Sequence, residues 1–390
     1  MTSYPLTAGS WDRREAAALQ RVIKSGQFTM GGEVRRFEQR FAKAVGSRHA
    51  VMVNSGSSAN LLAIAAMLYR RRGPWRRGDE VIVPALSWST TYFPVHQHGL
   101  RLVFVDIDPT TPNLEPARLE AARSPRTRAV FVPNILGNPA DLRAIQDFCS
   151  RHGLDFIEDN CESLGASLDG RQAGTFGLMG TFSTFYSHHI STMEGGVVVT
   201  DDEELRDILV CLRAHGWTRQ LGAGNKVARK GRDPFAESFR FVLPGYNVRP
   251  LELSGAVGVE QLRKLPAILR QRRANARVFR ELFGDDARFQ PQVEHGRSSW
   301  FGFALTVRGS GRNARRGMLA ALRKAGVEVR PVVAGNFLRN DVIARLDHRV
   351  VGAMPGADAV HDRGFFLGNH PYDLGKELRV AHRALASAGR

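Results

Sequence analysis

The segment from Ser183 to Gly196 contains side chains that can move protons. It reads STFYSHHISTMEGG, and two adjacent histidines, His188 and His189, lie between an apolar run and a Glu-Gly-Gly sequence. The unperturbed pKa of imidazole lies near neutrality, so either histidine is a candidate for acid–base chemistry. A single histidine is more often a satisfied residue of the core, and the residue types alone leave both interpretations open.

A carboxylate and an aromatic ring follow two other apolar runs. Asp159 ends the run LDFIED and is followed by Glu162. A carboxylate at this position can keep the nitrogen of a bound pyridine ring protonated through a charge-assisted hydrogen bond. Trp88, in PALSWSTTY, can stack on such a ring. The structural alternatives are an aspartate that caps a loop and a tryptophan that packs against one.

Small and hydroxyl-bearing residues lie where another apolar run gives way to a helical pattern. In VNSGSSANLLAIAA, Gly56, Ser57 and Ser58 stand at this junction. Unpaired N–H groups at a helix start, with hydroxyls beside them, form a cradle for phosphate. The same sequence also suits an ordinary turn and helix cap.

The elements that position these residues form an alternating pattern. Between residues 49 and 159, short runs rich in Val, Ile and Phe alternate with amphipathic stretches. This pattern predicts an α/β fold with a mostly parallel sheet covered on both faces. Ligands bind at the carboxyl ends of strands in such folds. We therefore expect the site to be built from residues 54–58, 87–91, 134–139, 159–162 and 183–196.

The C-terminal third has a different pattern. Residues 220–240 carry charges and glycines with little periodicity and are predicted to form a long exposed loop. Residues 249–283 predict a helix that is broken near Pro266, followed by strands in SSWFGFALTV and VEVRPVV. We predict a large α/β domain over residues 1–262 and a smaller α+β domain over residues 263–390.

Composition excludes several classes of protein. The 390 residues contain three widely spaced cysteines, which argues against a disulfide framework and against a Cys-only metal or iron–sulfur site. The net charge of +17 comes from scattered arginines, so we expect no nucleic-acid partner, although a basic surface attracts anionic small substrates. Because no apolar run is long enough to span a bilayer and the N-terminus lacks a signal-peptide pattern, we expect no membrane anchor and a cytoplasmic location.

Taken together, these segments resemble the nucleotide-sugar aminotransferase and dehydratase family of fold-type I pyridoxal-phosphate (PLP) enzymes. The resemblance covers nearly the whole chain, from FTMGGEVRRFEQRFAKAVGSRHAVMVNSGSSANLL through EDNCESLGA and GYNVRPLELSGAVGVEQL to SSWFGF and VRPVVAGNF. It implies a fold like that of aspartate aminotransferase, with PLP or pyridoxamine phosphate (PMP) as cofactor and a homodimer with shared active sites.

The resemblance gives His188 a specific meaning. In this family a serine stands five residues before the lysine that binds PLP, and a glutamate stands six residues after it. Counting from Ser183 or back from Glu194 reaches His188, and no lysine occurs between Lys43 and Lys226. The family's covalent link to PLP is therefore excluded at this position, and His188 can only move protons. His189 is interpreted as a structural neighbour.

The other site residues are carried over from the family's motifs. Asp159 is expected at the ring nitrogen, Trp88 on the ring face and Glu162 near the phenolic oxygen. The phosphate is expected at Gly56, Ser57, Ser58 and Ser183, with Asn247 reaching it from the partner subunit. The predicted substrate contacts are His215, Arg219, Arg330 and Asn336, and no metal is expected.

The lysine-free pattern most resembles the family's 3-dehydratases. It implies PMP-dependent removal of the 3-hydroxyl from GDP-4-keto-6-deoxy-D-mannose, with L-glutamate regenerating PMP. A dehydratase for another nucleotide-linked 4-keto-6-deoxy sugar is the alternative. A lysine-free enzyme that uses a [2Fe–2S] cluster and a reductase partner needs four clustered cysteines, which are absent. A catalytically silent relative would show decay of the pocket residues, and an ordinary aminotransferase would need the missing amine.

Overall fold

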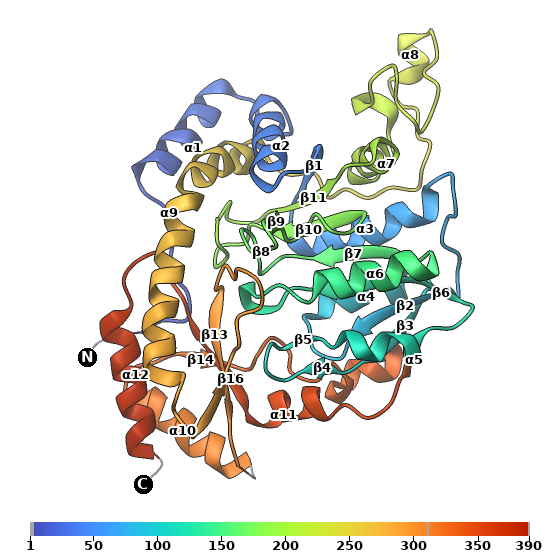
Figure 1. Cartoon of the computed structure of the whole chain (residues 1–390). Helices are drawn as coiled ribbons and strands as arrows, with labels where there is room; N and C mark the ends of the chain where they lie inside the picture. The colour runs from blue at the N-terminus through green and yellow to red at the C-terminus, as the bar shows by residue number, and fades with distance from the viewer. Residues whose placement is uncertain (1–3, 310–311, 389–390) are drawn as a thin grey trace.

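The computed structural model describes residues 4–309 and 312–388, and its centre is an eight-stranded sheet (Figure 1). Seven of its strands come from the first 200 residues, and β11 is the strand that runs antiparallel to its two neighbours. Across the sheet the order is β1 (His49–Val53), β11 (Gly196–Thr200), β10 (Met179–Ser183), β7 (Asp155–Asp159), β6 (Thr127–Pro133), β2 (Glu80–Pro84), β3 (Arg101–Val105) and β15 (His348–Val350).

Helices bury both faces of this sheet, as strand β2 illustrates. All five of its residues are buried. Val81 and Val83 pack into one core together with α3 (Gly56–Tyr69) and α4 (Ser89–Gln97), whereas Ile82 packs into another core together with α6 (Leu142–His152). Successive strand residues point to opposite faces, so a continuous apolar run fits a strand covered on both sides. The predicted α/β architecture is confirmed.

The smaller sheet is antiparallel and lies in the C-terminal third. Its strands are β12 (Phe289–Pro291), β13 (Gly302–Val307), β16 (Gly364–Gly368) and β14 (Val329–Arg330). Helices α10 (Arg312–Lys324) and α12 (Gly375–Ala388) pack against each other beside it, and α11 (Pro355–Arg363) lies between the two sheets. The strands predicted in SSWFGFALTV and VEVRPVV are confirmed. Because β15 returns to pair with β3, the chain crosses between the sheets more than once, and the boundary at 262/263 stays a prediction.

A single long helix, α9 (Glu252–Phe283), connects the two parts of the molecule. The predicted break near Pro266 is wrong, because the helix continues through this residue. Its first part packs against α1 (Arg13–Ser25) and α2 (Gly32–Val45), and its later part runs beside α12 (Figure 1). This packing on both sides of Pro266 compensates for the one backbone hydrogen bond that proline removes.

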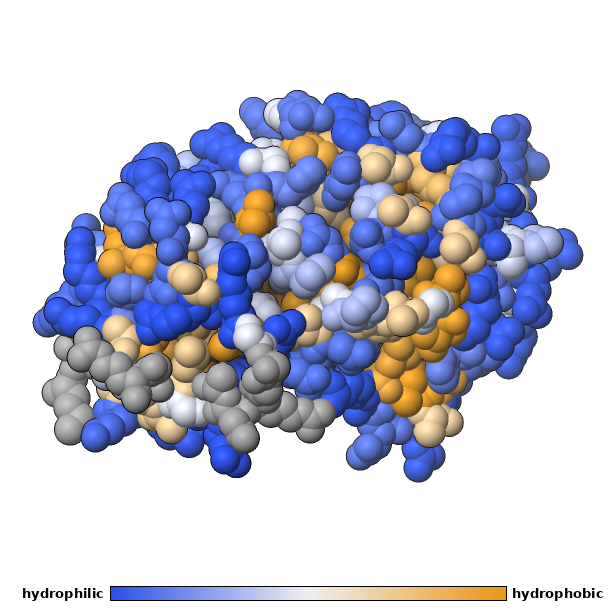
Figure 2. All heavy atoms as spheres, turned by 60° about the horizontal axis from the view of Figure 1, so that its bottom comes forward, coloured by the Kyte–Doolittle hydropathy of each residue, from blue (hydrophilic) through white to orange (hydrophobic). Residues whose placement is uncertain are grey.

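Residues 221–245 form an extension with the short helix α8 (Pro234–Glu237), which projects beyond α7 (Glu203–Arg213) (Figure 1). Phe235 and Phe239 are 87% and 71% exposed there. Elsewhere the surface is largely hydrophilic, with separate apolar patches, as Figure 2 shows for one face. Within the described ranges, no helix is long and apolar enough to cross a membrane.

Candidate active site

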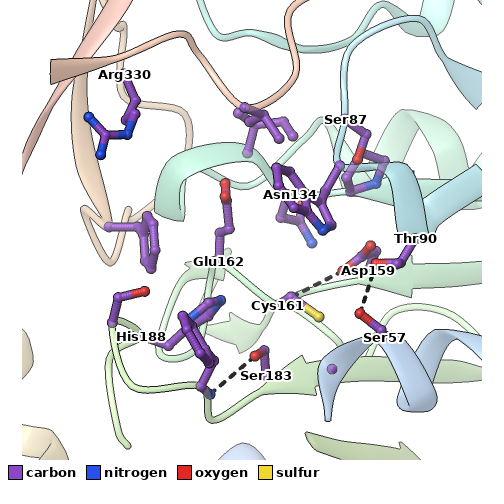
Figure 3. Close-up of a pocket in the computed structure, with 18 of the residues that line it drawn as sticks. Ser57, Ser87, Thr90, Asn134, Asp159, Cys161, Glu162, Ser183, His188 and Arg330 are labelled. Carbon is purple, nitrogen blue, oxygen red and sulfur yellow. Dashed lines mark hydrogen bonds between the residues drawn. The ribbon is translucent and has the colours of Figure 1, made fainter. Parts of the chain in front are cut away.

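A cavity of about 630 Å³ lies where the large sheet meets the smaller one. The ends of β7 and β10 contribute Asp159 and Ser183, the start of α3 contributes Gly56 and Ser57, and β14 contributes Arg330 (Figure 3). Of the predicted site residues, the cavity is lined by Gly56, Ser57, Trp88, Asp159, Glu162, Ser183, His188 and Arg330. The structure therefore brings most of the predicted set together around one space.

Asp159 is held by three donors at the end of β7. Its Oδ2 accepts hydrogen bonds from Asn60 Nδ2 at 2.8 Å and from the Thr91 hydroxyl at 2.7 Å, and its Oδ1 accepts one from the backbone N–H of Cys161 at 3.2 Å. The residue is 7% exposed. A carboxylate fixed in this way is suited to hold a proton on a bound ring nitrogen.

The start of α3 forms a neighbouring part of the cavity wall. Ser55 caps this helix by accepting a hydrogen bond from the N–H of Ser58, so the N–H groups of Gly56 and Ser57 belong to the first, unpaired turn. A Cβ atom at Gly56 would lie 2.6 Å from Cβ of Ser183. Glycine therefore permits the close approach that puts these N–H groups beside the Ser183 hydroxyl, an arrangement suited to phosphate.

Trp88 precedes α4 and is 58% exposed although it lines the cavity. A large indole ring with a free face at a cavity wall is suited to stack on a planar ring. Together the aspartate, the tryptophan and the phosphate cradle fit a phosphorylated pyridine such as PLP or PMP.

His188 lies in a tight turn after β10. Its backbone N–H donates to the carbonyl of Phe185 at 2.9 Å, and the hydroxyls of Thr184 and Thr192 lie 2.6 Å apart, which closes the base of the loop. The ring centroid of His188 lies 5.1 Å from that of Phe301, another residue of the cavity wall. The turn thus fixes the backbone at 188, and the imidazole faces the cavity (Figure 3).

Burial, together with the smaller effect of the positive charge of Arg272, lowers the pKa of His188 to about 4. The ring is therefore neutral at neutral pH and able to accept a proton. His189 is buried, and its Nε2 lies 3.2 Å from the carbonyl oxygen of Ser299. Since His189 does not line the cavity, its placement agrees with a structural role.

Burial raises the pKa of Glu162, a hydrogen bond from the N–H of Leu136 opposes this shift, and the charge of Asp159 adds to it, so that the pKa is about 7. That bond is 2.9 Å long. Near neutral pH this carboxyl group therefore exists in both protonation states, and it can donate a hydrogen bond to an oxygen of a bound molecule.

Two predicted residues lie outside the cavity wall in contacts of their own. The Ser58 hydroxyl lies 3.0 Å from that of Ser55. Asn336 is buried, donates to Asp358 Oδ1 at 2.9 Å and accepts from the N–H of Leu338. Both side chains therefore have hydrogen-bond partners within the protein. Whether Ser58 contacts the phosphate and Asn336 the substrate is still a prediction.

Three other predicted residues, His215, Arg219 and Asn247, are exposed and lie outside the cavity wall of their own chain. Arg219 stacks over the ring of Trp217 at 5.0 Å, and Asn247 accepts a hydrogen bond from Arg249. His215 has a φ of 63°, a strained value for a residue other than glycine.

Some residues of the site were not predicted. Asn60 lies inside α3, beyond the predicted loop 54–58, and its contact with Asp159 depends on the first turns of that helix facing β7. Thr91 lies in the predicted segment 87–91 but was not given a role. Phe301 and Asn369 enter from the smaller sheet, whose placement against the larger one no local pattern reveals.

No lysine lines the cavity in the described part of the chain. Over the same residues, no cluster of three or more His, Cys, Asp or Glu side chains is arranged to hold a metal ion. The cavity does contain a histidine that can transfer protons and a cradle suited to the phosphate of a planar ring.

Comparison with known proteins finds close relatives among nucleotide-sugar dehydratases. GDP-4-keto-6-deoxy-D-mannose 3-dehydratase of Yersinia pseudotuberculosis is 51% identical over 381 residues, 97% of each chain. A solved structure of a mutant of GDP-4-keto-6-deoxymannose-3-dehydratase with bound GDP-perosamine has a TM-score of 0.96 and 49% identity, covering 98% of this chain and 100% of that one. A structure of the enzyme with a trapped PLP–glutamate geminal diamine matches with the same TM-score, identity and coverage.

The match extends to the family level. The model of the DegT/DnrJ/EryC1/StrS aminotransferase family matches residues 10–382. The fold is thus that of the fold-type I PLP-dependent transferases, as the sequence predicted, and the chain belongs to the DegT/DnrJ/EryC1/StrS aminotransferase family.

Proposed function

We propose that this protein is a PLP/PMP-dependent nucleotide-sugar 3-dehydratase that acts on GDP-4-keto-6-deoxy-D-mannose and uses L-glutamate to regenerate PMP. The reaction removes the 3-hydroxyl and gives GDP-4-keto-3,6-dideoxy-D-mannose. The relatives at about half sequence identity carry this activity in their names, and one structure of such a relative holds GDP-perosamine.

The observation that carries the proposal is the neutral His188 at the wall of a lysine-free cavity that otherwise fits PLP. A lysine would bind the cofactor covalently between turnovers, whereas an imidazole only accepts and donates protons. This difference favours loss of a hydroxyl over stable placement of an amine on the sugar.

Six residues of the cavity then have defined roles. Bound PMP supplies an amine for the sugar ketone and a ring that stabilises negative charge. Asp159 keeps the ring nitrogen protonated, and Trp88 covers the ring face. Gly56, Ser57 and Ser183 bind the phosphate through N–H and hydroxyl groups. His188 removes and returns the proton at the cofactor carbon C4′.

The second half of the cycle uses the same histidine. Transfer of the amino group from L-glutamate also requires proton movement at C4′, and His188 is the proposed group for this step as well. A structure of the relative with a trapped PLP–glutamate adduct supports glutamate as the amino donor.

Arg330 is the proposed contact to the anionic part of a substrate. It lines the cavity, it is exposed, and the only hydrogen bond that it makes within the described residues is to the carbonyl of Val329. A guanidinium with free donors is suited to a diphosphate or a carboxylate. His215, Arg219 and Asn336 are proposed as further substrate contacts.

We propose a homodimer in which each chain completes the site of the other. Asn247 is exposed and lies outside its own cavity, and the neighbouring extension exposes Phe235, Phe239 and Phe241. Exposed aromatic side chains in this number are typical of a protein interface. Mixing N247A and H188N chains tests shared sites, because mixed dimers would regain activity that neither parent has.

We also propose a cytoplasmic location without a reductase partner. Cys149, Cys161 and Cys211 are all free thiols, as expected in a reducing compartment, and an electron-transfer cluster would need four clustered cysteines.

The test is incubation of the protein with PLP, L-glutamate and GDP-4-keto-6-deoxy-D-mannose, with dTDP- and CDP-linked 4-keto-6-deoxy sugars as controls. The GDP-linked substrate should yield 2-oxoglutarate and ammonia in equal amounts together with a 3-deoxy sugar. Accumulation of a 4-amino sugar that keeps its 3-hydroxyl would show an aminotransferase, and turnover of a different nucleotide sugar would reassign the substrate.

A further inference from the structure

Arg272, on α9, is a buried cation that makes no ion pair within residues 4–309 and 312–388. It is 3% exposed, and its Nη1 donates to the carbonyls of Trp300, Phe301 and Asn369 at 3.5, 3.1 and 2.8 Å. Burial lowers its pKa to about 10, so the guanidinium stays charged at neutral pH. Burying a charge without a counter-ion costs folding free energy. A functional role of the charge would explain why the protein retains it.

Residues 299–301 connect this charge to the catalytic turn. Arg272 donates to the carbonyl of Phe301, whose ring packs against His188 at a centroid distance of 5.1 Å. One residue earlier along the chain, Trp300 has a φ of 50°, and its carbonyl oxygen also accepts a hydrogen bond from Arg272. The backbone segment that Arg272 fixes is therefore the one whose side chain supports His188.

The surroundings of His188 are the reverse of a hydrolase triad. In a triad a buried carboxylate accepts the Nδ1 proton and stabilises the imidazolium ion. Here Nδ1 of His188 is buried without a hydrogen-bond partner among the described residues, and the charge that acts on the ring is that of Arg272. The other ionisable side chains around it are those of the neighbouring His189 and of the cavity wall, which are Asp159, Cys161, Glu162, Glu194 and Arg330.

We propose that Arg272 is a positioning residue: it fixes the backbone that carries Phe301 against His188, and its buried positive charge adds to burial in disfavouring the imidazolium form of His188. This inference rests on the proposed role of His188 in acid–base chemistry. An imidazolium that forms beside a buried guanidinium is destabilised, so His188 gives its proton up readily. One imidazole can then serve as base and as acid within the same turnover.

The test compares three variants of the full-length protein. R272M removes the charge and keeps an apolar chain, whereas R272K keeps the charge. The matched control is R273M, because Arg273 is the next residue of α9. Arg273 also donates to backbone carbonyls, those of Ser298 and Gly165. Its charge acts on His189. The His188 ring is followed by NMR in histidine-labelled protein with PLP bound, and the H188N variant assigns its signal among the 12 histidines.

In the unmodified protein, His188 should stay neutral from pH 5.5 to 8. R272M should raise the pKa of His188 by about one unit, which is the order expected for removal of one nearby charge in a partly buried site. The pH below which 2-oxoglutarate formation slows should rise by the same amount. R272K and R273M should leave the His188 titration nearly unchanged.

Three results would overturn the proposal: a titration of His188 near pH 6.5 in the unmodified protein, an unshifted titration in R272M, or equal shifts in R272K and R272M. If R272M does not fold, R272Q, which also removes the charge but keeps N–H donors for the backbone carbonyls, takes its place in the comparison with R272K. These titrations require no nucleotide sugar, so their outcome is separate from that of the substrate test.

Discussion

The side-chain amide of Asn60 donates a hydrogen bond of 2.8 Å to Oδ2 of Asp159, which joins the first turns of α3 to the end of β7. The Thr181 hydroxyl donates in turn to Oδ1 of Asn60 at 2.5 Å, so strand β10 is part of the same network. This network links the helix that presents the phosphate cradle to the carboxylate proposed for the ring nitrogen.

Removing the charge of Asp159 should impair the reaction more than the fold. D159N keeps the shape but loses a charge-assisted hydrogen bond of ~1.5–3 kcal/mol, so turnover should fall about 10- to 100-fold. The measurement is the steady-state rate of 2-oxoglutarate formation. Asp155, at the other end of β7, binds Arg70 and Trp75, so D155N should lower the unfolding temperature and leave the rate per folded molecule unchanged. Equal rates for D159N and the unmodified protein would remove Asp159 from the mechanism.

A methyl group at Gly56 should weaken cofactor binding. Its Cβ would lie 2.6 Å from Cβ of Ser183, and overpacking of this kind costs about 1–3 kcal/mol. The Kd for PLP, measured by absorbance titration, should rise about 10-fold or more in G56A. The matched control is G32A, because Gly32 also begins a helix but no atom lies within 4 Å of the added methyl. An unchanged Kd in G56A would mean that phosphate binds elsewhere.

Glu162 should make stability depend on pH. Its pKa is raised from 4.5 to about 7, so the folded protein resists the ionisation that the unfolded chain undergoes freely. The contribution of Glu162 to stability is therefore lost as the pH rises from about 4.5 through 7. E162Q cannot ionise, so its unfolding temperature relative to the unmodified protein should rise between pH 5 and pH 8 in the absence of PLP. A constant difference over this range would contradict the shifted pKa.

The sequence predicted the parts of the fold and of the site that local patterns determine. Val81, Ile82 and Val83 form a continuous apolar run, and a strand covered on both faces is the structure that buries all three. Asp159 and Ser183 each end such a strand, so topology alone places them at one edge of the sheet. Their positions could therefore be predicted from strand ends.

Contacts between distant segments were not predictable in this way. Arg272 looks like any other arginine of an amphipathic helix, and only the packing of α9 against residues 299–301 shows that it is buried near His188. Pro266 suggested a broken helix because its local effect is unfavourable, but tertiary packing on both sides of it decides the outcome. Asn336 was predicted to contact substrate, and its hydrogen bond to Asp358 depends on α11, 22 residues further along the chain.

The half-reaction with L-glutamate isolates the role of His188, because it requires proton movement at C4′ and no nucleotide sugar. H188N should bind PLP with little change, because the cradle and Asp159 are intact, yet form 2-oxoglutarate at least about 100-fold more slowly, as expected when a general acid–base group is lost. H189N, which alters the buried neighbour, should retain most of this rate in its folded fraction. Undiminished 2-oxoglutarate formation by PLP-loaded H188N would mean that a group other than His188 moves the proton at C4′.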